Sequence, residues 1–256
     1  MRNRLRYIIT IINVAAVITL FCLTGVWPGE FKQAQLDCAR VKQAYKNKEE
    51  VLKGRFEEAG LEYPPRQIFI RVFKRERVLE LWAWSESDSL FKLVTSYKIC
   101  AVSGTLGPKR REGDRQIPEG FYYINNFNPW SDYHLSLQIN YPNESDLKLG
   151  YKKDPGSLIF IHGNCVTIGC IPIRDRYIEE LYIAAVEARD NVQKKIPVHI
   201  FPFRMRADSY EDLKAIYNDA KTLKFWDNLK VGFDYFEEQH TLPEVRVDRH
   251  GAYVFE

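Results

Sequence analysis

A histidine and two cysteines lie close together near the middle of the chain, in the segment Leu158-Ile-Phe-Ile-His162-Gly-Asn-Cys165-Val-Thr-Ile-Gly-Cys170. The apolar run predicts a strand that ends at His162, and a short loop then leads to Cys170 beside Gly169. The thiolate is the nucleophilic form of cysteine, and a neighbouring histidine is the usual means of generating it near neutral pH. Cys170 and His162 are therefore the minimum apparatus for acyl transfer.

Other interpretations of this segment remain open on the residues alone. Cys165 and Cys170 permit a disulfide in an oxidising compartment, and either of them is also compatible with a buried, inert thiol. A metal site is a further alternative, but the spacing His-x2-Cys-x4-Cys matches no common zinc arrangement and no second ligand pair accompanies it. We therefore predict neither a metal nor a cofactor, and keep a redox or metal protein as a rival class.

The amino terminus has the pattern of an export signal. Arg2, Arg4 and Arg6 precede an apolar stretch, residues 8–26, whose only clearly polar side chains are Asn13 and three threonines. This length is close to the ~20 residues that span a bilayer, and no good A-x-A cleavage site follows. A cleaved signal peptide and an uncleaved signal anchor both remain open. In either case we expect the body in the periplasm or cell envelope, held at the inner membrane if the segment is uncleaved.

The charge of the body argues against a nucleic-acid partner. The 256 residues include 37 basic and 34 acidic side chains, a net charge of +3. The three leader arginines account for the whole excess, so residues 30–256 are electrically balanced. A balanced body is not the composition of a protein that binds nucleic acid over its surface.

Hydrophobic periodicity predicts the elements that position the Cys–His pair. One helical face, ending at Gly60, is formed by Phe31, Ala34, Cys38, Val41, Tyr45, Leu52 and Phe56. Alternation over 68–72 and 79–83 predicts a hairpin, and further strands are predicted at 91–99, 120–124, 134–139, 158–161 and 197–201. Long polar loops interrupt them at 103–119 and 140–156. Loops of this length in a compact domain are usually functional or mobile.

The remainder of the chain returns to helix. Asp175 is a candidate N-cap, a second helix is expected near 209–217, and a final hairpin is expected to turn at 248–251. These elements predict an α+β fold with a mainly β core, an N-terminal helix after the membrane leader, and C-terminal helices plus a hairpin. The predicted organisation is a leader at 1–29, an amphipathic helix and linker at 30–65, a catalytic domain at 66–203 and a C-terminal extension at 204–256.

The chemical segment resembles the signature of the YkuD-type L,D-transpeptidases, in which an Ile-His-Gly strand end is followed by [Ser/Thr]-x-Gly-Cys. The run Ile117-Pro-Glu-Gly-Phe-Tyr-Tyr-Ile124 and the loop before it resemble the family's Pro-x-Gly-x-Tyr strand entry. The run 127–143 is similar to the YafK-like branch of the family. The resemblance covers roughly residues 66–203 and implies a YkuD-type catalytic core.

The chain also departs from the common family pattern. Only seven residues separate His162 from Cys170, where a longer insertion is usual, and Ile168 stands where a histidine is often found. Ile171-Pro-Ile173 replaces the usual Arg-containing continuation. The short loop fits the YafK-like branch. We expect the nucleophile and the base to carry over to this chain, but not the acceptor specificity.

The resemblance implies a mechanism. Cys170 attacks the carbonyl of an L-to-D bond in a peptidoglycan stem peptide, and His162 either takes the thiol proton or rests with the thiolate as an ion pair. Backbone N–H groups of Cys170 and Gly169 are expected to hold the oxyanion, and Thr167 to orient the loop or the acyl group. Because no acid closely follows His162, a backbone carbonyl is expected to orient its ring.

Three further side chains are candidates for substrate binding. His134 precedes an alternating strand, and a strand-edge histidine bonded locally is the alternative for it. Arg110 and Arg111 belong to a basic run that also includes Lys109 and Arg115. These residues are candidates to pair with stem-peptide carboxylates, with a solvated charge run as the alternative.

The predicted function is that of a peptidoglycan L,D-transpeptidase in cell-wall cross-linking and remodelling. One alternative is a hydrolytic L,D-endopeptidase or amidase that releases a peptidoglycan-bound lipoprotein, and another is a non-catalytic peptidoglycan-binding module. The expected partners are stem peptides and, under the hydrolytic alternative, an envelope lipoprotein. Retention of His162, Gly169 and Cys170 together argues against the binding module, since binding needs no thiol.

Overall fold

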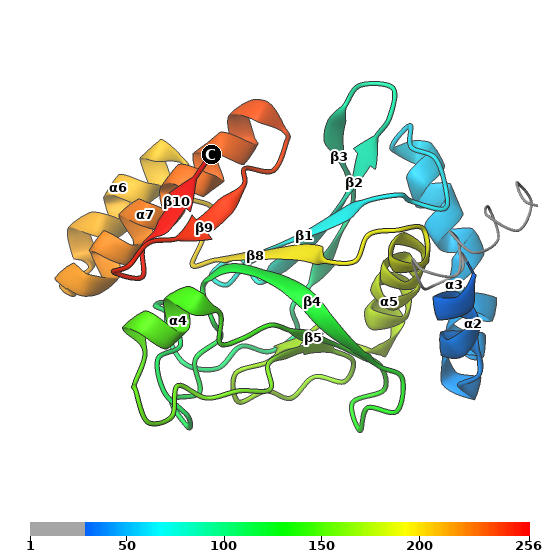
Figure 1. Ribbon diagram of the computed structural model, residues 1–256, viewed down its shortest axis with the longest axis horizontal. Helices are drawn as coiled ribbons and strands as arrows, with labels where there is room; N and C mark the ends of the chain where they lie inside the picture. Colours follow the sequence, from blue (N-terminus) through cyan, green and yellow to red (C-terminus); the bar gives the residue numbers. More distant parts are fainter. Residues whose placement is uncertain (1–28) are drawn as a thin grey trace, which may run out of the picture.

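The computed structural model describes residues 29–256, so the predictions for the leader lie outside the described residues. The strands are β1 (Ile68–Phe73), β2 (Val78–Ser85), β3 (Leu90–Lys98), β4 (Gly120–Asn128), β5 (Ser136–Ile139), β6 (Phe160–His162), β7 (Ile171–Pro172), β8 (Ile196–Phe201), β9 (Val245–Val247) and β10 (Tyr253–Phe255). The first eight form one mixed sheet in the order β3-β2-β1-β8-β4-β5-β6-β7, and β9 and β10 form a separate hairpin (Figure 1).

Helices lie at both ends of this sheet. The described helices are α2 (Glu30–Leu36), α3 (Ala39–Glu58), α4 (Glu144–Leu149), α5 (Asp175–Asp190), α6 (Ala207–Ile216) and α7 (Ala220–Gln239). In Figure 1, α2, α3 and α5 lie together at one end, and α6, α7 and the β9–β10 hairpin lie at the other. Within residues 29–256 no helix is both long enough and apolar enough to cross a membrane. The predicted α+β class, with helices on either side of a β core and a final hairpin, is confirmed for this part of the chain.

The centre of the sheet is buried on both faces. All six residues of β1 are buried, and alternate side chains of a strand point to opposite faces. Ile68, Ile70 and Val72 pack in the core that includes α3 and α5. Phe73, on the other face, packs with residues of α6 and α7. The sheet is therefore covered by hydrophobic packing on both faces, and the C-terminal extension supplies most of the cluster around Phe73.

The strand predictions correspond to elements of the sheet with shifted ends. The hairpin predicted at 68–72 and 79–83 is the antiparallel pair β1–β2, with Ile70 opposite Leu81. The strands predicted at 91–99, 120–124, 134–139, 158–161 and 197–201 are β3, β4, β5, β6 and β8. The two-residue strand β7 was not predicted, because two residues carry no periodicity.

The single helix predicted from Phe31 to Phe56 is wrong, since the chain breaks at Asp37–Cys38 into α2 and α3. Cys38 has extended backbone angles (φ −81°, ψ 124°) and serves as the N-cap position of α3. Its thiol donates to the carbonyl of Pro129 at 3.6 Å. The break turns the start of α3 toward the loop after β4, where Cys38 and Arg40 contact backbone carbonyls.

Two other boundaries differ from the sequence prediction. The predicted polar loop at 140–156 contains α4, whose start is a capping box: Asn143 accepts from the backbone N–H of Asp146, and Asp146 accepts from that of Asn143. Asp175 is the first residue of α5 rather than its N-cap, which is Arg174. The Asp175 carboxylate instead accepts a hydrogen bond from the backbone N–H of Asn164 at 2.6 Å.

Candidate active site

His162 and Cys170 lie at neighbouring strand ends. His162 is the last residue of β6, and Cys170 immediately precedes β7. The two strands pair in parallel, with Ile161 opposite Ile171. Continuing this register by one residue places Cys170 beside Phe160, on the same face as His162 and two positions before it. The fold thus brings the predicted nucleophile and the predicted base to one edge of the sheet.

The His162 ring is buried and held in one orientation. It is 1% exposed, and its Nδ1 lies 2.6 Å from the carbonyl oxygen of Gly163. The Tyr133 ring contacts it at an interplanar angle of 37°, with centroids 4.7 Å apart. Because a carbonyl only accepts, Nδ1 carries the hydrogen and Nε2 keeps a lone pair. Burial lowers the pKa of His162 below its usual value. The ring is therefore a neutral imidazole at pH 7, with Nε2 able to accept a proton.

Cys170 is a half-buried free thiol. Its Sγ donates to the carbonyl of Leu158 at 3.8 Å. Burial raises the pKa of the thiol, partly offset by a backbone hydrogen bond from Phe160 and by the positive charge of Lys109. Among the described residues, no hydrogen bond joins Sγ to His162. This geometry favours a neutral thiol beside a neutral base over a resting ion pair.

The loop between the two residues is braced by Thr167. Its Oγ1 accepts from the backbone N–H of Gly169 at 3.0 Å and donates to the carbonyl of Cys170 at 2.8 Å. The Gly169 N–H, one of the two expected oxyanion donors, is thus engaged within the loop. The Cys170 N–H donates to no other described backbone group. Gly169 has φ 143°, and a Cβ there would lie 3.1 Å from the carbonyl oxygen of Gln116, so the turn requires glycine.

The cysteine pairing also differs from the alternative left open by the sequence. Cys165 forms a disulfide with Cys100, which follows β3, and the two Cα atoms are 5.7 Å apart. Cys38 and Cys170 are free. A Cys165–Cys170 disulfide is therefore excluded in this structure, and the disulfide instead ties the loop that carries Cys170 to the end of β3. In the described part of the chain, no group of three or more His, Cys, Asp or Glu side chains is placed to hold a metal ion.

Comparison with known proteins identifies the family. The profile of the YkuD family, described as the L,D-transpeptidase catalytic domain, matches residues 68–200. The chain belongs to the YkuD family. It is 39% identical over 189 residues to the Escherichia coli K12 protein named "Putative L,D-transpeptidase YafK", a match that covers 73% of each chain. The YafK protein of Escherichia coli O157:H7 matches equally well.

Two solved structures are also similar to this YkuD-family chain. The helical cell shape determining protein Pgp2 from Campylobacter jejuni has a TM-score of 0.43 and 18% identity, and the match covers 77% of this chain and 80% of that one. Bd1075 from Bdellovibrio bacteriovorus has a TM-score of 0.38 and 20% identity, covering 72% of this chain and 75% of that one.

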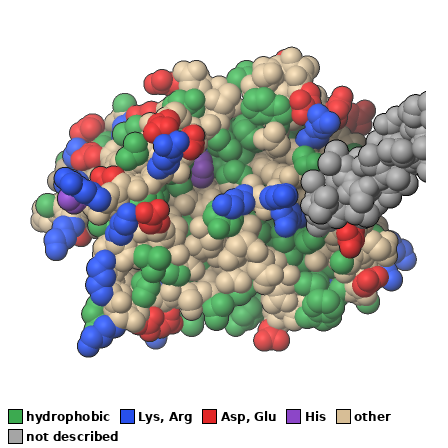
Figure 2. All heavy atoms as spheres, viewed as in Figure 1, with side chains coloured by type: hydrophobic (Ala, Val, Ile, Leu, Met, Phe, Trp, Pro, Cys, Tyr) green, Lys and Arg blue, Asp and Glu red, His purple; other side chains and the backbone are tan. Residues whose placement is uncertain are grey.

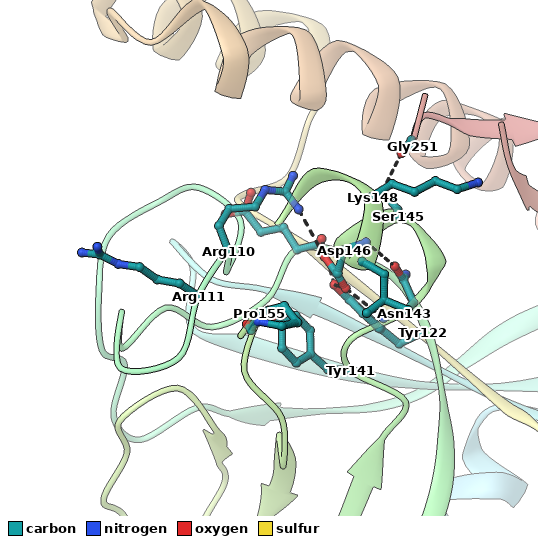
Figure 3. A network of polar contacts seen from close by, with 12 residues as sticks. Arg110, Arg111, Tyr122, Tyr141, Asn143, Ser145, Asp146, Lys148, Pro155 and Gly251 are labelled. Atoms are coloured by element: carbon teal, nitrogen blue, oxygen red, sulfur yellow. Dashed lines mark hydrogen bonds and ion pairs between the residues drawn. The ribbon is translucent and has the colours of Figure 1, made fainter. Parts of the chain in front are cut away.

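The basic run in the loop of this YkuD domain has three different environments. Lys109 is buried, and its Nζ pairs with Asp114 at 2.7 Å. Arg110 contacts Asp146 at 3.3 Å. Figure 3 shows the Arg110 side chain turned toward this carboxylate and the Arg111 side chain directed away from the network. Lys109 and Arg110 therefore hold the loop in place, and Arg111 is the one of these three side chains that is free to reach a ligand.

His134 lies beside the predicted base but has its own partner. Its Nε2 is 2.8 Å from Oε1 of Glu179 on α5, a residue 45 positions further along the chain. The loop that carries Tyr133 and His134 is held by Arg40 of α3, whose Nη1 donates to the carbonyls of Ser131, at 2.7 Å, and of His134. His134 therefore lies next to the strand end that carries His162, with its ring directed to Glu179.

Sequence reasoning missed four residues that position the site. Arg40 holds the loop that carries Tyr133, the Tyr133 ring covers that of His162, and the Asp175 carboxylate fixes the backbone after His162. Gly163 permits this close approach, because a Cβ there would lie 2.6 Å from both Asp175 Oδ1 and the carbonyl of Tyr133. The His-Gly pair was the only available signal, since the other contacts join segments far apart in the sequence.

Proposed function

We propose that this protein is a peptidoglycan L,D-transpeptidase that acts through a thioester on Cys170. The observation that carries the proposal is the neutral imidazole of His162, whose Nδ1 is fixed by the carbonyl of Gly163 and whose Nε2 is left to accept the thiol proton. Membership in the YkuD family supports peptidoglycan stem peptides as the substrate class. The match to YafK supports a place in that branch.

In the first half of the reaction, Nε2 of His162 takes the proton from Cys170, and Sγ attacks the carbonyl carbon of an L-to-D peptide bond. The N–H of Cys170 donates to the oxygen as negative charge develops. When the tetrahedral intermediate collapses, the C–N bond breaks and the imidazolium gives its proton to the departing amine. The products of this half are a free amine and a thioester.

In the second half, His162 removes a proton from an incoming nucleophile, which attacks the thioester and releases the Cys170 thiol. An amine as nucleophile gives a new cross-link, and water gives hydrolysis. The chemistry of the site is the same for both. Transpeptidation is the proposed outcome, and hydrolytic release of a stem-bound lipoprotein is the alternative that the product analysis below tests.

We also propose that the protein works in the periplasm or at the envelope face of the inner membrane. Its substrate polymer is there, and residues 1–29 have the pattern of an export signal. The Cys100–Cys165 disulfide supports the same compartment, because such bonds persist in oxidising surroundings. A fusion of the full chain to a reporter enzyme that is active only after export tests this, and a fusion that is produced but has no reporter activity contradicts it.

The test of the function incubates the full-length protein with stem-tetrapeptide muropeptides and with sacculi that carry a bound lipoprotein. Mass spectrometry follows the products and any acyl adduct, with Cys170→Ala as the matched control. Cross-linked dimers support the transpeptidase. Shortened stems or a released lipoprotein peptide assign hydrolysis to the same thiol. An acyl adduct that persists in Cys170→Ala, or substrates untouched by the wild type, contradicts the proposal.

A further inference from the structure

A cavity on the described part of the chain lies outside the Cys170–His162 pair. It has a volume of about 810 Å³ and opens between the 103–119 loop and the C-terminal extension. We call it the extension pocket. Residues that line it include Leu106, Arg110, Gln116, Lys221, Lys224 and Phe225. Neither Cys170 nor His162 lines it, so the extension pocket is separate from the reacting atoms.

Gln116 connects the extension pocket to the turn before Cys170. Its side chain lines the pocket and is fixed by Thr105, which donates from its backbone N–H to Oε1 at 2.8 Å and accepts from Nε2 at 3.2 Å. The carbonyl oxygen of Gln116 faces the other way, 3.1 Å from the position of a Cβ on Gly169. One residue thus separates the pocket from the turn that presents Cys170. A ligand in the pocket therefore lies against the residue that also packs on the Cys170 turn.

The pocket carries an excess of positive charge. Lys221 and Lys224 line it from the first turns of α7, both exposed, and within residues 29–256 neither pairs with a carboxylate. The single acidic lining residue, Asp219, is engaged as the N-cap of α7, accepting from the N–H of Lys221 at 3.1 Å and from Thr222 Oγ1 at 2.6 Å. Figure 2 shows Lys and Arg side chains along the side formed by α4, α6 and α7.

Arg110 also lines the pocket, with its charge paired to Asp146. Its guanidinium lies 4.7 Å from the centroid of the Phe225 ring, and its contact with Asp146 holds it beneath the helix that Figure 3 shows above it. Burial raises the pKa of Asp146 to about 6. Leu106, Pro108 and Tyr217 add apolar surface. The pocket therefore suits a ligand with an aliphatic body and more than one carboxylate.

We propose that the extension pocket binds a carboxylate-bearing peptidoglycan stem peptide, with Lys221 and Lys224 pairing with its free carboxylates. The choice of a stem peptide rests on the proposed function, since the ligand must reach from the pocket to Cys170. The C-terminal extension is then a specificity element for acidic peptide.

The test measures binding of a purified disaccharide-tetrapeptide to full-length Cys170→Ala protein by calorimetry. The double variant Lys221→Gln/Lys224→Gln is compared with Lys42→Gln/Lys46→Gln, which removes two exposed, unpaired lysines from α3 at the far end of the molecule. We expect Kd to rise about 5- to 10-fold in the pocket variant and to stay unchanged in the α3 variant. A tetrapeptide with amidated carboxylates is expected to bind more weakly, and equally to all three proteins.

Equal Kd values for the pocket and α3 variants, or an amidated peptide that binds as tightly as the free acid, overturn the inference. On the background with Cys170 intact, the pocket variant is expected to raise KM about 5- to 10-fold with kcat unchanged. If the wild type shows no turnover but the Kd depends on Lys221 and Lys224, the proposed function is contradicted and the proposed binding in the pocket is supported. If the wild type turns over the substrate but the Kd does not depend on Lys221 and Lys224, only the proposed binding in the pocket is contradicted.

Discussion

The protonation states of Cys170 and His162 decide how the proposed site depends on pH. Burial raises the pKa of the thiol and lowers that of the imidazole. We therefore expect alkylation of Cys170 by iodoacetamide to keep accelerating above pH 9, as the thiolate fraction grows. Because His162 must be neutral to act as a base, kcat/KM is expected to hold to a lower pH than it would with a histidine of ordinary pKa. An alkylation rate that is constant from pH 5 to 8, corrected with Cys170→Ala, would indicate an ion pair instead.

Thr167 gives a residue-level test of the loop. Its hydroxyl makes both hydrogen bonds that brace the turn before Cys170. We expect Thr167→Val, which keeps the shape and loses the hydroxyl, to lower kcat/KM about 10-fold or more, since two hydrogen bonds of about 1 kcal/mol each are lost. Thr167→Ser keeps the hydroxyl and is expected to retain most activity. Steady-state kinetics on muropeptides measures both, and equal losses in the two variants would assign the effect to packing.

Asp146 is expected to make stability depend on pH with an unusual sign. Burial raises its pKa to about 6, from 3.8. The folded state therefore binds this proton more tightly than the unfolded state, so the contribution of Asp146 to the free energy of unfolding rises as the pH falls from 7 to 4. Between pH 7 and pH 4.5 the gain is about 2 kcal/mol, and Asp146→Asn removes it. Urea unfolding of the wild type and of Asp146→Asn at pH 7 and 4.5 measures this effect. A difference in free energy of unfolding between the two proteins that is the same at both pH values would contradict the prediction.

At the scale of elements, local pattern was sufficient to predict some features but not others. The hairpin of β1 and β2, the strand ending at His162 and the turn of the last hairpin carry their own periodicity and turn residues. The insertion of β8 between β1 and β4 joins segments more than 70 residues apart, and nothing local encodes it. The partner of Cys165 was equally hidden, because spacing does not determine disulfide connectivity. The capping box of Asn143 and Asp146 is a signal that the sequence does contain, and it explains why α4 forms in a polar stretch.

The disulfide between Cys100 and Cys165 constrains the loop that carries Cys170, so we expect its loss to lower the activity. It closes a loop of 65 residues and fixes the segment between His162 and Cys170 to the end of β3. In the double variant Cys100→Ala/Cys165→Ala we expect the free energy of unfolding to fall by about 2–4 kcal/mol. We also expect kcat/KM to fall about 10-fold, because the Cys170 turn loses an anchor.

Reductant provides the control for this prediction. Dithiothreitol is expected to lower the unfolding midpoint of the wild type to that of the double variant, and to leave the double variant unchanged. A wild-type protein whose activity and midpoint are insensitive to complete reduction would contradict the role assigned to the bond.

At the scale of the whole molecule, the C-terminal extension packs against the YkuD domain as part of one hydrophobic core. Its residues Trp226, Leu229 and Phe233 are fully or almost fully buried against Phe73 and Phe201 of the sheet. The sequence placed a boundary at residue 204, where the motifs stop, but hydrophobic burial continues across it. An interface of this kind behaves as a core, so residues 66–203 alone would expose one face of β1 and β8.

A buried polar network joins the extension to the loop beside the site. Lys74 Nζ donates to the carbonyls of Gly107 and Ile117 and pairs with Glu119 at 2.8 Å. The second carboxylate oxygen of Glu119 accepts from Nε1 of Trp226 on α7 at 2.8 Å. The Lys74–Glu119 ion pair, which is nearly inaccessible to water, thus joins both ends of the 103–119 loop to α7.

Trp226→Phe tests whether this network sets the geometry of the site. The ring change keeps most of the packing and leaves one oxygen of the buried Glu119 without its donor, which is expected to cost about 1–3 kcal/mol of unfolding free energy. Because the same carboxylate holds Gly107, the 103–119 loop loosens and kcat/KM falls, although Trp226 touches neither Cys170 nor His162. Trp130→Phe, at a side chain that is 71% exposed, is the matched control and is expected to change neither quantity. A Trp226→Phe protein that loses stability but keeps full activity in the folded state would show that the network holds the fold together without positioning the loop.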